Sequence, residues 1–170
     1  MEMEIVIRPI EAADVEAIPP AFAAVGWPKP REQFERYVAD QAAGVHEVRV
    51  AYAGGEVCGY LKVVWRPEYA PWRQAGIPEI QDLNVLPAFR RRGVATRLMD
   101  AAEALIAERS PVAGIGVALY ADSGPAQVMY VRRGYVPDGL GATYHNQRLA
   151  GGETVVADDD LVLHLTRRLR

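Results

Sequence analysis

Apolar residues recur along the chain in two patterns, one typical of helices and one typical of strands. Helical spacing over residues 11–25 predicts a helix that Pro19-Pro20 should break or kink, because proline lacks an N–H and clashes with the preceding turn. Two β-rich runs on either side of Gly54-Gly55 predict a hairpin. In chain order, the first half predicts a strand at 4–8, helices at 11–25 and 31–43, and strands at 45–53 and 56–65.

The second half of the chain alternates between strand and helix patterns in the same way. Val94, Leu98 and Leu105 recur at helical spacing and predict a helix at 92–109 with one packed face. The apolar run at 112–120 is typical of a strand buried inside a sheet. This order of elements predicts an α/β fold with one mixed sheet. The other expected elements are a loop at 67–78, a strand at 79–86, a helix at 123–133 and two β-like segments at 141–149 and 160–169.

The composition is that of an ordinary soluble domain, with 50% hydrophobic and 24% charged residues. The length of 170 residues predicts a single domain over residues 1–170. The net charge of −3 argues against a nucleic-acid-binding protein, which usually carries a basic excess. The first residues lack a signal-peptide pattern and no run is long enough to span a membrane, so we expect a cytoplasmic protein. The single cysteine, Cys58, lies in an apolar run and is expected to be a buried structural thiol.

The segment from Asp82 to Met99 carries the strongest functional signal. An apolar strand leads through a proline turn into Arg90-Arg91-Arg92-Gly93 and then into the helix at 92–109. The first turn of a helix has unpaired N–H groups at the positive end of its dipole, and the arginines add fixed cations. These features predict a phosphate or pyrophosphate site, with a solvated basic turn as the plain alternative. Glycine suits such a site because a phosphate can approach its backbone closely.

Arg90, Gly93 and Ala95 form the pattern Arg-x-x-Gly-x-Ala, which resembles the acetyl-CoA pyrophosphate loop of the GNAT superfamily of N-acetyltransferases. Residues 82–85 are similar to the family strand that pairs with pantetheine, and residues 123–135 are similar to a second family motif. The resemblance implies acetyl-CoA as co-substrate and a GNAT-like fold. Its mixed sheet would have about six to seven strands, splayed at the centre and flanked by about four helices. The residues implied to bind acetyl-CoA are Leu83, Asn84, Val85, Arg90, Arg91, Arg92, Gly93, Val94, Ala95, Thr96, Ser123, Ala126 and Tyr130.

The resemblance also implies roles in catalysis. Glu79 aligns with the strand position where several GNAT enzymes place the base that accepts the proton of the amine. On an alternating strand, Glu79 shares a side with Leu83 and Val85, and Asp82, a weaker candidate, lies on the other side. Tyr130 matches the tyrosine that hydrogen-bonds the leaving CoA sulfur. A backbone N–H near Val85 is expected to stabilise the developing oxyanion.

Each candidate also has a structural explanation. Glu79 would then be a solvated carboxylate at a strand end, and Tyr130 a core aromatic residue. Ser123 stands where many relatives have asparagine, and its side chain has a shorter reach. The three histidines lack metal-ligand spacing and Asp158-Asp159-Asp160 is expected to be a charged turn, so no metal is expected. Aromatic residues expected near the acceptor, although core packing also explains each, are Trp27, Phe34, Trp65, Tyr69, Trp72 and Tyr144.

These residues and the resemblance predict an N-acetyltransferase that transfers an acetyl group from acetyl-CoA to a primary amine. The amine, expected to be a small molecule, would attack directly in a ternary complex. Two alternatives stay open, namely a non-catalytic acyl-CoA-binding sensor and a protein or peptide acetyltransferase. We expect no nucleic-acid or membrane partner, and a homodimer is compatible with the resemblance because relatives often pair.

Overall fold

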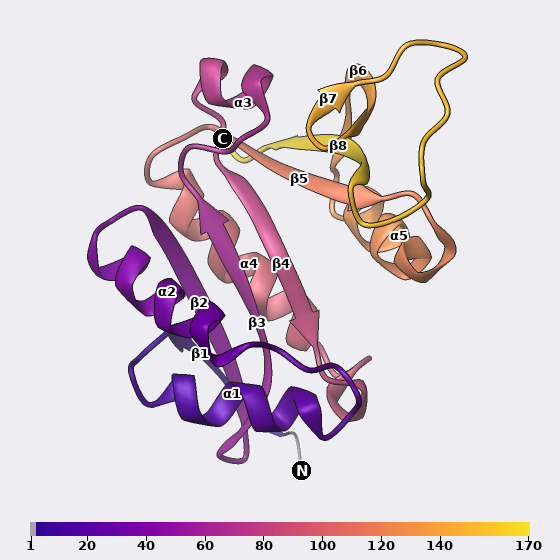
Figure 1. Cartoon of the computed structure of the whole chain (residues 1–170). Coiled ribbons are helices and arrows are strands. Elements are labelled where there is room, and N and C mark those ends of the chain that lie inside the picture. The colour runs from indigo at the N-terminus through magenta and orange to yellow at the C-terminus, as the bar shows by residue number, and fades with distance from the viewer. Residues whose placement is uncertain (1–2) are drawn as a thin grey trace. The chain divides into compact units, whose positions relative to one another are not determined.

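The computed structural model describes residues 3–170, which form two compact units (Figure 1). Unit 1 consists of the described residues up to 64 together with 81–105, and unit 2 consists of residues 65–80 and 106–170. The division runs through β4 (Glu79–Val85) and α4 (Val94–Ala107), so each of these elements contributes to both units. The single domain over residues 1–170 stays a prediction.

Unit 1 contains three antiparallel strands, β1 (Ile5–Pro9), β2 (His46–Ala53) and β3 (Glu56–Val64), together with the end of β4. The expected hairpin is confirmed, since Ala53 pairs with Glu56 across Gly54-Gly55. Both glycines have positive φ, 58° and 83°, which a two-residue turn of this type requires.

Helices cover both faces of these strands. α1 (Asp14–Ala23) and α2 (Arg31–Ala42) pack on one face, and α4 packs on the other (Figure 1). Side chains alternate along a strand, so two neighbouring residues of β3, Gly59 and Tyr60, point to opposite faces of the sheet. The ring of Tyr60 packs against Phe22 and Phe34 at centroid distances of 5.4 and 5.3 Å, whereas Gly59 faces Leu98 of α4.

α1 continues through Pro19 and Pro20, so the predicted break in this helix is wrong. The two prolines remove only two N–H donors, and the carbonyl groups that they leave unpaired belong to the first turns of the helix. Ile18 and Phe22 lie on the inner face of α1 and are fully buried. Packing of this apolar face stabilises the helix. Local helix propensity alone would not stabilise it.

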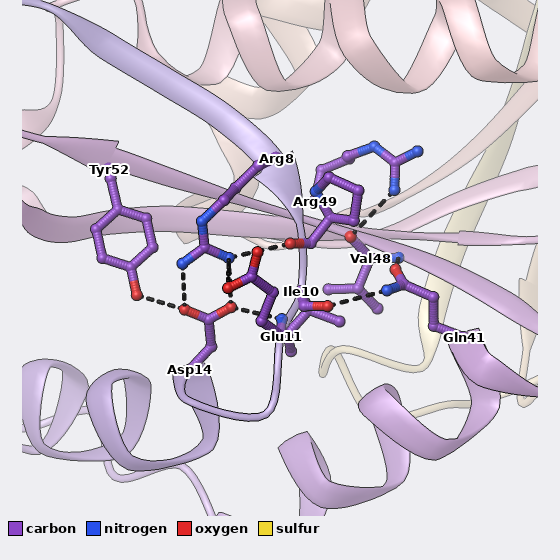
Figure 2. Close-up of polar contacts among 9 residues, drawn as sticks. Arg8, Ile10, Glu11, Asp14, Gln41, Val48, Arg49 and Tyr52 are labelled. Carbon is purple, nitrogen blue, oxygen red and sulfur yellow. Dashed lines mark hydrogen bonds and ion pairs between the residues drawn. The ribbon is translucent and has the colours of Figure 1, made fainter.

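A buried ion pair fixes the start of α1 against β1 and β2 (Figure 2). The carboxylate of Asp14 is fully buried and accepts hydrogen bonds from both terminal nitrogens of Arg8, at 2.7 and 2.8 Å. It also accepts from the hydroxyl of Tyr52 and from the N–H of Glu11 at 2.7 Å. Burial acts to raise the pKa of Asp14, but the hydrogen bonds from Arg8, Tyr52 and Glu11 outweigh it and hold the pKa below its ordinary value.

The start of β4 pairs in parallel with β5 (Val112–Ala118) in unit 2, where β8 (Leu161–Arg168) joins β5 to β6 (Val136–Tyr144). β7 (Gln147–Arg148) completes the strand order β1-β2-β3-β4-β5-β8-β6-β7. With α3 (Ala70–Ala75) and α5 (Gly124–Arg132), the described residues contain eight strands and five α-helices. The mixed α/β fold is confirmed, with slightly more elements than expected. None of the helices in residues 3–170 is long and apolar enough to cross a bilayer.

Two elements of unit 2 differ from the sequence-based expectation. α3 occupies part of the predicted loop at 67–78, and its signal was Pro71 in the first turn followed by Gly76 at the C-terminal end, with a φ of 68°. β6 begins at Val136 rather than near residue 141. Its pairing with β8 shifts register between Pro137 and Ala142, because a proline and two glycines interrupt the regular strand pattern there.

Candidate active site

The loop before α4 ends at a glycine, which has no side chain to cap the helix. The carbonyl of Gly93 accepts the first helical hydrogen bond, from the N–H of Arg97 at 3.0 Å, so Gly93 is the N-cap residue. A glycine has no side chain with which to bond the N–H groups of residues 94–96. Gly93 has a φ of 83° and Arg91 a φ of 58°, and a Cβ on Gly93 would meet no atom within 4 Å. The space beside Gly93 is therefore open.

The three arginines of this loop have different surroundings. The guanidinium of Arg90 lies over the ring of Trp27, 5.0 Å from its centroid, and the Nε donates to the carbonyl of Val85 at 3.4 Å. Arg91 and Arg92 are exposed. Arg90 thus holds the loop against Trp27, and all three arginines are exposed and supply positive charge.

β4 changes direction at Asp82, whose φ is 55°. The carboxylate accepts hydrogen bonds from the Tyr37 hydroxyl at 2.7 Å, from Gln33 Nε2 at 3.1 Å and from Asn84 Nδ2 at 2.7 Å. The amide oxygen of Asn84 in turn accepts from Lys29 Nζ at 3.4 Å. The regular alternation expected along β4 is therefore wrong at this residue, and Asp82 is held by donors from α2. Burial, and next the charge of Asp82, raises the pKa of Tyr37 and keeps its hydroxyl a donor.

β3 and β4 approach closely beside this bend. A Cβ on Gly59 would lie 2.5 Å from the carbonyl oxygen of Asn84 and 3.3 Å from Cγ2 of Val85. The N–H of Leu86 donates to the carbonyl of Cys58 at 2.9 Å, which continues the contact. Gly59 is not among the sequence-predicted site residues, although a glycine inside an apolar strand is a signal for close backbone approach.

Glu79 is the first residue of β4 and lies in unit 2. Its side chain is 7% exposed, so the alternative of a solvated strand-end carboxylate is wrong. The residue pairs with Gly114 of β5, and a Cβ on Gly116 would lie 3.6 Å from Oε1 of Glu79. The carboxylate therefore lies beside Gly116 of β5.

An aromatic cluster covers the same glycine-rich stretch of β5. The ring of His164 stacks on Tyr69, with centroids 3.7 Å apart and an interplanar angle of 12°, and Trp72 meets His164 edge-on at 4.9 Å. Trp72 fills the space over Gly114, where a Cβ would lie 2.5 Å from its ring. His164 is not among the sequence-predicted site residues, because its place in this cluster arises from pairing between distant strands.

Tyr130 lies on α5 and is 6% exposed. Burial raises the pKa of Tyr130 to about 12. Full proton transfer from such a phenol to a thiolate with a pKa of about 8.5 is uphill by about 5 kcal/mol. The hydroxyl is therefore suited to donate a hydrogen bond to a leaving thiolate rather than to protonate it.

The start of α5 is fixed to the end of β5. Gln127 Nε2 donates to the carbonyl of Ala118 at 2.9 Å. Ser123 is the N-cap residue, yet its hydroxyl makes no capping hydrogen bond, and Ala126 is half-buried one turn further on. The side chain of Ser123 thus has no structural task at the helix start.

Comparison with known proteins identifies the family. A model of the acetyltransferase (GNAT) domain matches residues 44–137, more than half of the chain. The chain belongs to the GNAT acetyltransferase family. It is therefore an acetyl-CoA-dependent acyltransferase. The matched region contains β4, the arginine loop and α5, the three segments on which the resemblance rests. Among curated proteins, none matches the chain significantly.

Solved GNAT structures share the fold over almost the whole chain. An acetyltransferase from Desulfovibrio desulfuricans is 14% identical, with a TM-score of 0.73, 98% of this chain covered and 100% of that one. NAA60 from Arabidopsis thaliana, solved in complex with acetyl-CoA, is 17% identical, with a TM-score of 0.68 and coverage of 97% and 98%. Spermidine/spermine N-acetyltransferase SpeG from Vibrio cholerae is 14% identical, with a TM-score of 0.66 and coverage of 98% and 93%. At these identities the likeness concerns the fold alone.

The other residues considered from the sequence pack in the core or make contacts with neighbouring side chains of this GNAT chain. Cys58 is confirmed as a buried thiol, and burial raises its pKa to about 11. Phe34 is a fully buried core residue. Tyr144 donates to Asp158 at 3.1 Å within the expected charged turn, and the guanidinium of Arg109 covers Trp65 at 4.0 Å. In residues 3–170, no group of three His, Cys, Asp or Glu side chains is placed to hold a metal.

Proposed function

We propose that this GNAT acyltransferase is an N-acetyltransferase that acetylates the primary amine of a small molecule. The observation that carries the proposal is the burial of Glu79, a carboxylate that is 7% exposed on a face lined by glycines and aromatic rings. An amine with a pKa of about 10.4 is almost fully protonated at neutral pH and must lose a proton before it attacks. A buried carboxylate is a suitable acceptor for that proton.

The loop before α4 would bind the diphosphate of acetyl-CoA. The helix start at Gly93, the open space beside that glycine and the exposed Arg91 and Arg92 fit an anionic group of this size. Leu83, Asn84 and Val85 on β4 are proposed to contact the pantetheine arm. Ser123 and Ala126 are also assigned to acetyl-CoA. The other residues assigned to this cofactor are Arg90, Val94, Ala95, Thr96 and Tyr130.

Acetyl-CoA supplies an activated acetyl group whose thiolate is a good leaving group. Tyr130 is proposed to donate a hydrogen bond to that sulfur, for which its buried hydroxyl is suited. The amine attacks directly, because Cys58 is buried with a raised pKa and is a poor nucleophile.

A cavity in unit 2 supports a small acceptor. It measures about 470 Å³ and lies between α3 and the β6–β7 turn. Small-molecule sites generally have volumes of this order. Glu68 lines the cavity together with Arg73 and Arg148, so it presents both signs of charge. An acceptor that carries an anionic group as well as its amine would fit this lining.

The test is release of CoA thiol from acetyl-CoA in the presence of polyamines, amino acids, aminoglycosides and short peptides, with product identity checked by mass spectrometry. We expect amine-dependent release. Glu79→Gln should lower kcat by about 10²- to 10⁴-fold, and Tyr130→Phe by about 10²-fold. Tyr120→Phe, which removes a hydroxyl near the surface, is the matched control and should leave kcat unchanged.

Other outcomes would replace the proposal. Binding of CoA without transfer to any amine would indicate an acyl-CoA sensor. Transfer to peptides alone would indicate a protein acetyltransferase. Wild-type turnover in both Glu79→Gln and Tyr130→Phe would remove these residues from catalysis while leaving the reaction in place.

A further inference from the structure

Lys29 lies beside the strand to which the proposed function assigns acetyl-CoA. The connection between α1 and α2 crosses over the end of β4 (Figure 1), and Nζ of Lys29 lies 3.4 Å from Oδ1 of Asn84. The pantetheine arm is proposed to contact residues 83–85, so this amine would neighbour the arm that carries the acetyl group. All of these residues belong to unit 1.

Two prolines restrict the backbone that presents this lysine. Pro28 and Pro30 flank Lys29, and each proline fixes its own φ at about −65°. A residue that precedes a proline is confined to extended conformations, and this applies to Lys29. Pro30 has a φ of −62° and a ψ of 134° and is the N-cap residue of α2. The lysine side chain therefore starts from a nearly fixed position beside β4.

The amide oxygen that meets the lysine is also fixed. Nδ2 of Asn84 donates to the carboxylate of Asp82 at 2.7 Å and to its backbone carbonyl at 3.1 Å. The carboxylate is held in turn by Tyr37 and Gln33 of α2. Because the amide nitrogen is bonded to Asp82, Oδ1 of Asn84 is left as the acceptor for the amine of Lys29.

The two contacts of this amine are weak ones. A distance of 3.4 Å to a neutral amide oxygen is long for a hydrogen bond. The other contact is with the ring of Phe22, at 5.8 Å from its centroid, which is the outer range of cation–π attraction. Lys29 is also half-buried rather than enclosed. The amine can therefore leave Asn84 and give a proton to water, which it must do before it attacks a carbonyl carbon.

The other lysine has different surroundings. The sequence contains two lysines, Lys29 and Lys62. Nζ of Lys62 lies over the ring of Tyr37, 5.0 Å from its centroid, and its positive charge lowers the pKa of His46. Gly59 is the β3 residue that approaches Asn84, and Lys62 lies further along that strand. Lys62 is thus a matched control for an effect that depends on the contact with Asn84.

We propose that Lys29 is a self-acetylation site, whose Nζ accepts the acetyl group of acetyl-CoA bound to the same chain. Nζ forms a bond with the carbonyl carbon of the acetyl group, and the bond from that carbon to the CoA sulfur breaks. The ammonium group gives up two protons, one to water and one to the leaving sulfur, so the products are acetyl-lysine and CoA thiol. The inference rests on the proposed acetyl-CoA site.

Incubation of the purified protein with acetyl-CoA alone, followed by peptide mass spectrometry, tests the inference. We expect acetylation of Lys29 at least about tenfold faster than that of Lys62, because a positioned amine reacts within the complex. Lys29→Arg should abolish the modification and Lys62→Arg should retain it. The half-time at saturating acetyl-CoA should not depend on protein concentration. Equal rates at the two lysines, an unmodified Lys29, or a rate that rises with protein concentration would overturn the inference.

A second measurement does not depend on acetyl transfer. CoA without an acetyl group should slow the reaction of Lys29 with a water-soluble N-hydroxysuccinimide ester and leave the reaction of Lys62 unchanged. Equal labelling of Lys29 with and without CoA would overturn the inference. Small amines added to the acetyl-CoA samples separate the two proposals. Transfer to a small amine with an unmodified Lys29 would reject self-acetylation alone, whereas an acetylated Lys29 without transfer to any small amine would reject only the small-molecule acceptor.

Discussion

At the scale of single residues, Gly93 shows how a backbone position can serve a ligand. Its φ of 83° is one that side-chain-bearing residues rarely adopt, and its Cβ position is open. Gly139 on β6 has a φ of 85° and is equally open, but it lies outside the loop. The two glycines therefore share the same conformational constraint and differ in their proposed contact with phosphate.

We expect Gly93→Ala to weaken CoA binding by about tenfold, because a shifted backbone loses charge-assisted hydrogen bonds worth about 1.5–3 kcal/mol each. Gly139→Ala should cost similar stability and leave CoA affinity unchanged. Isothermal titration calorimetry of CoA, with thermal melts of both variants, measures the two effects. Equal CoA affinity in wild type and Gly93→Ala would contradict the assignment of this loop.

Some candidate residues are recognised from local sequence patterns, and others are brought together only by contacts between distant segments. The arginine loop and Tyr130 belong to short local patterns, so the sequence alone was enough to propose them. The burial of Glu79 and the approach of His164 depend on pairing of β5 with β4 and β8, which joins residues 79, 116 and 164. The bend at Asp82 depends likewise on donors from α2. No local pattern encodes these contacts.

At the scale of elements, packing accounts for most departures from the expected secondary structure. α1 tolerates two prolines because its inner face is buried. β6 begins before its predicted start because the strand pairs with β8 on both sides of a register shift. Elements with regular periodicity and clear turns, such as the β2–β3 hairpin and α4, were predictable to within about two residues.

The attachment of α1 to the strands gives an element-scale prediction. Asp14→Ala leaves the guanidinium of Arg8 and the hydroxyl of Tyr52 without their acceptor. Because Arg8 is 29% exposed and can regain water, we expect a loss of about 2–3 kcal/mol, below the cost for a fully buried pair. Glu16→Ala on the same helix, which removes an exposed ion pair with Arg31, should cost less than about 1 kcal/mol. Urea unfolding followed by circular dichroism compares them, and a similar small loss in both would contradict a stabilising role for the buried pair.

At the scale of the whole molecule, two buried groups, His164 and Asp14, make the free energy of unfolding depend on pH. Each group acts over its own pH range. The pKa of His164 is lowered to about 4, mainly by burial. Between that value and the ordinary pKa of about 6.5, the unfolded chain binds a proton that the folded protein does not. Stability therefore falls as the pH drops through this range. Asp14, whose pKa is lowered below its ordinary value, adds a further loss only at lower pH.

The free energy of unfolding of the wild type should thus decrease between pH 7 and pH 5, with His164 contributing about 1–2 kcal/mol after allowance for residual solvent screening. His164→Phe cannot take up a proton on unfolding, so its stability should vary less over this range, whatever its value at pH 7. His145→Phe, which replaces a ring that is 62% exposed, is the matched control. Urea titrations at several pH values measure these slopes. Parallel pH dependences for wild type and His164→Phe would mean that the imidazole is not buried in its neutral form.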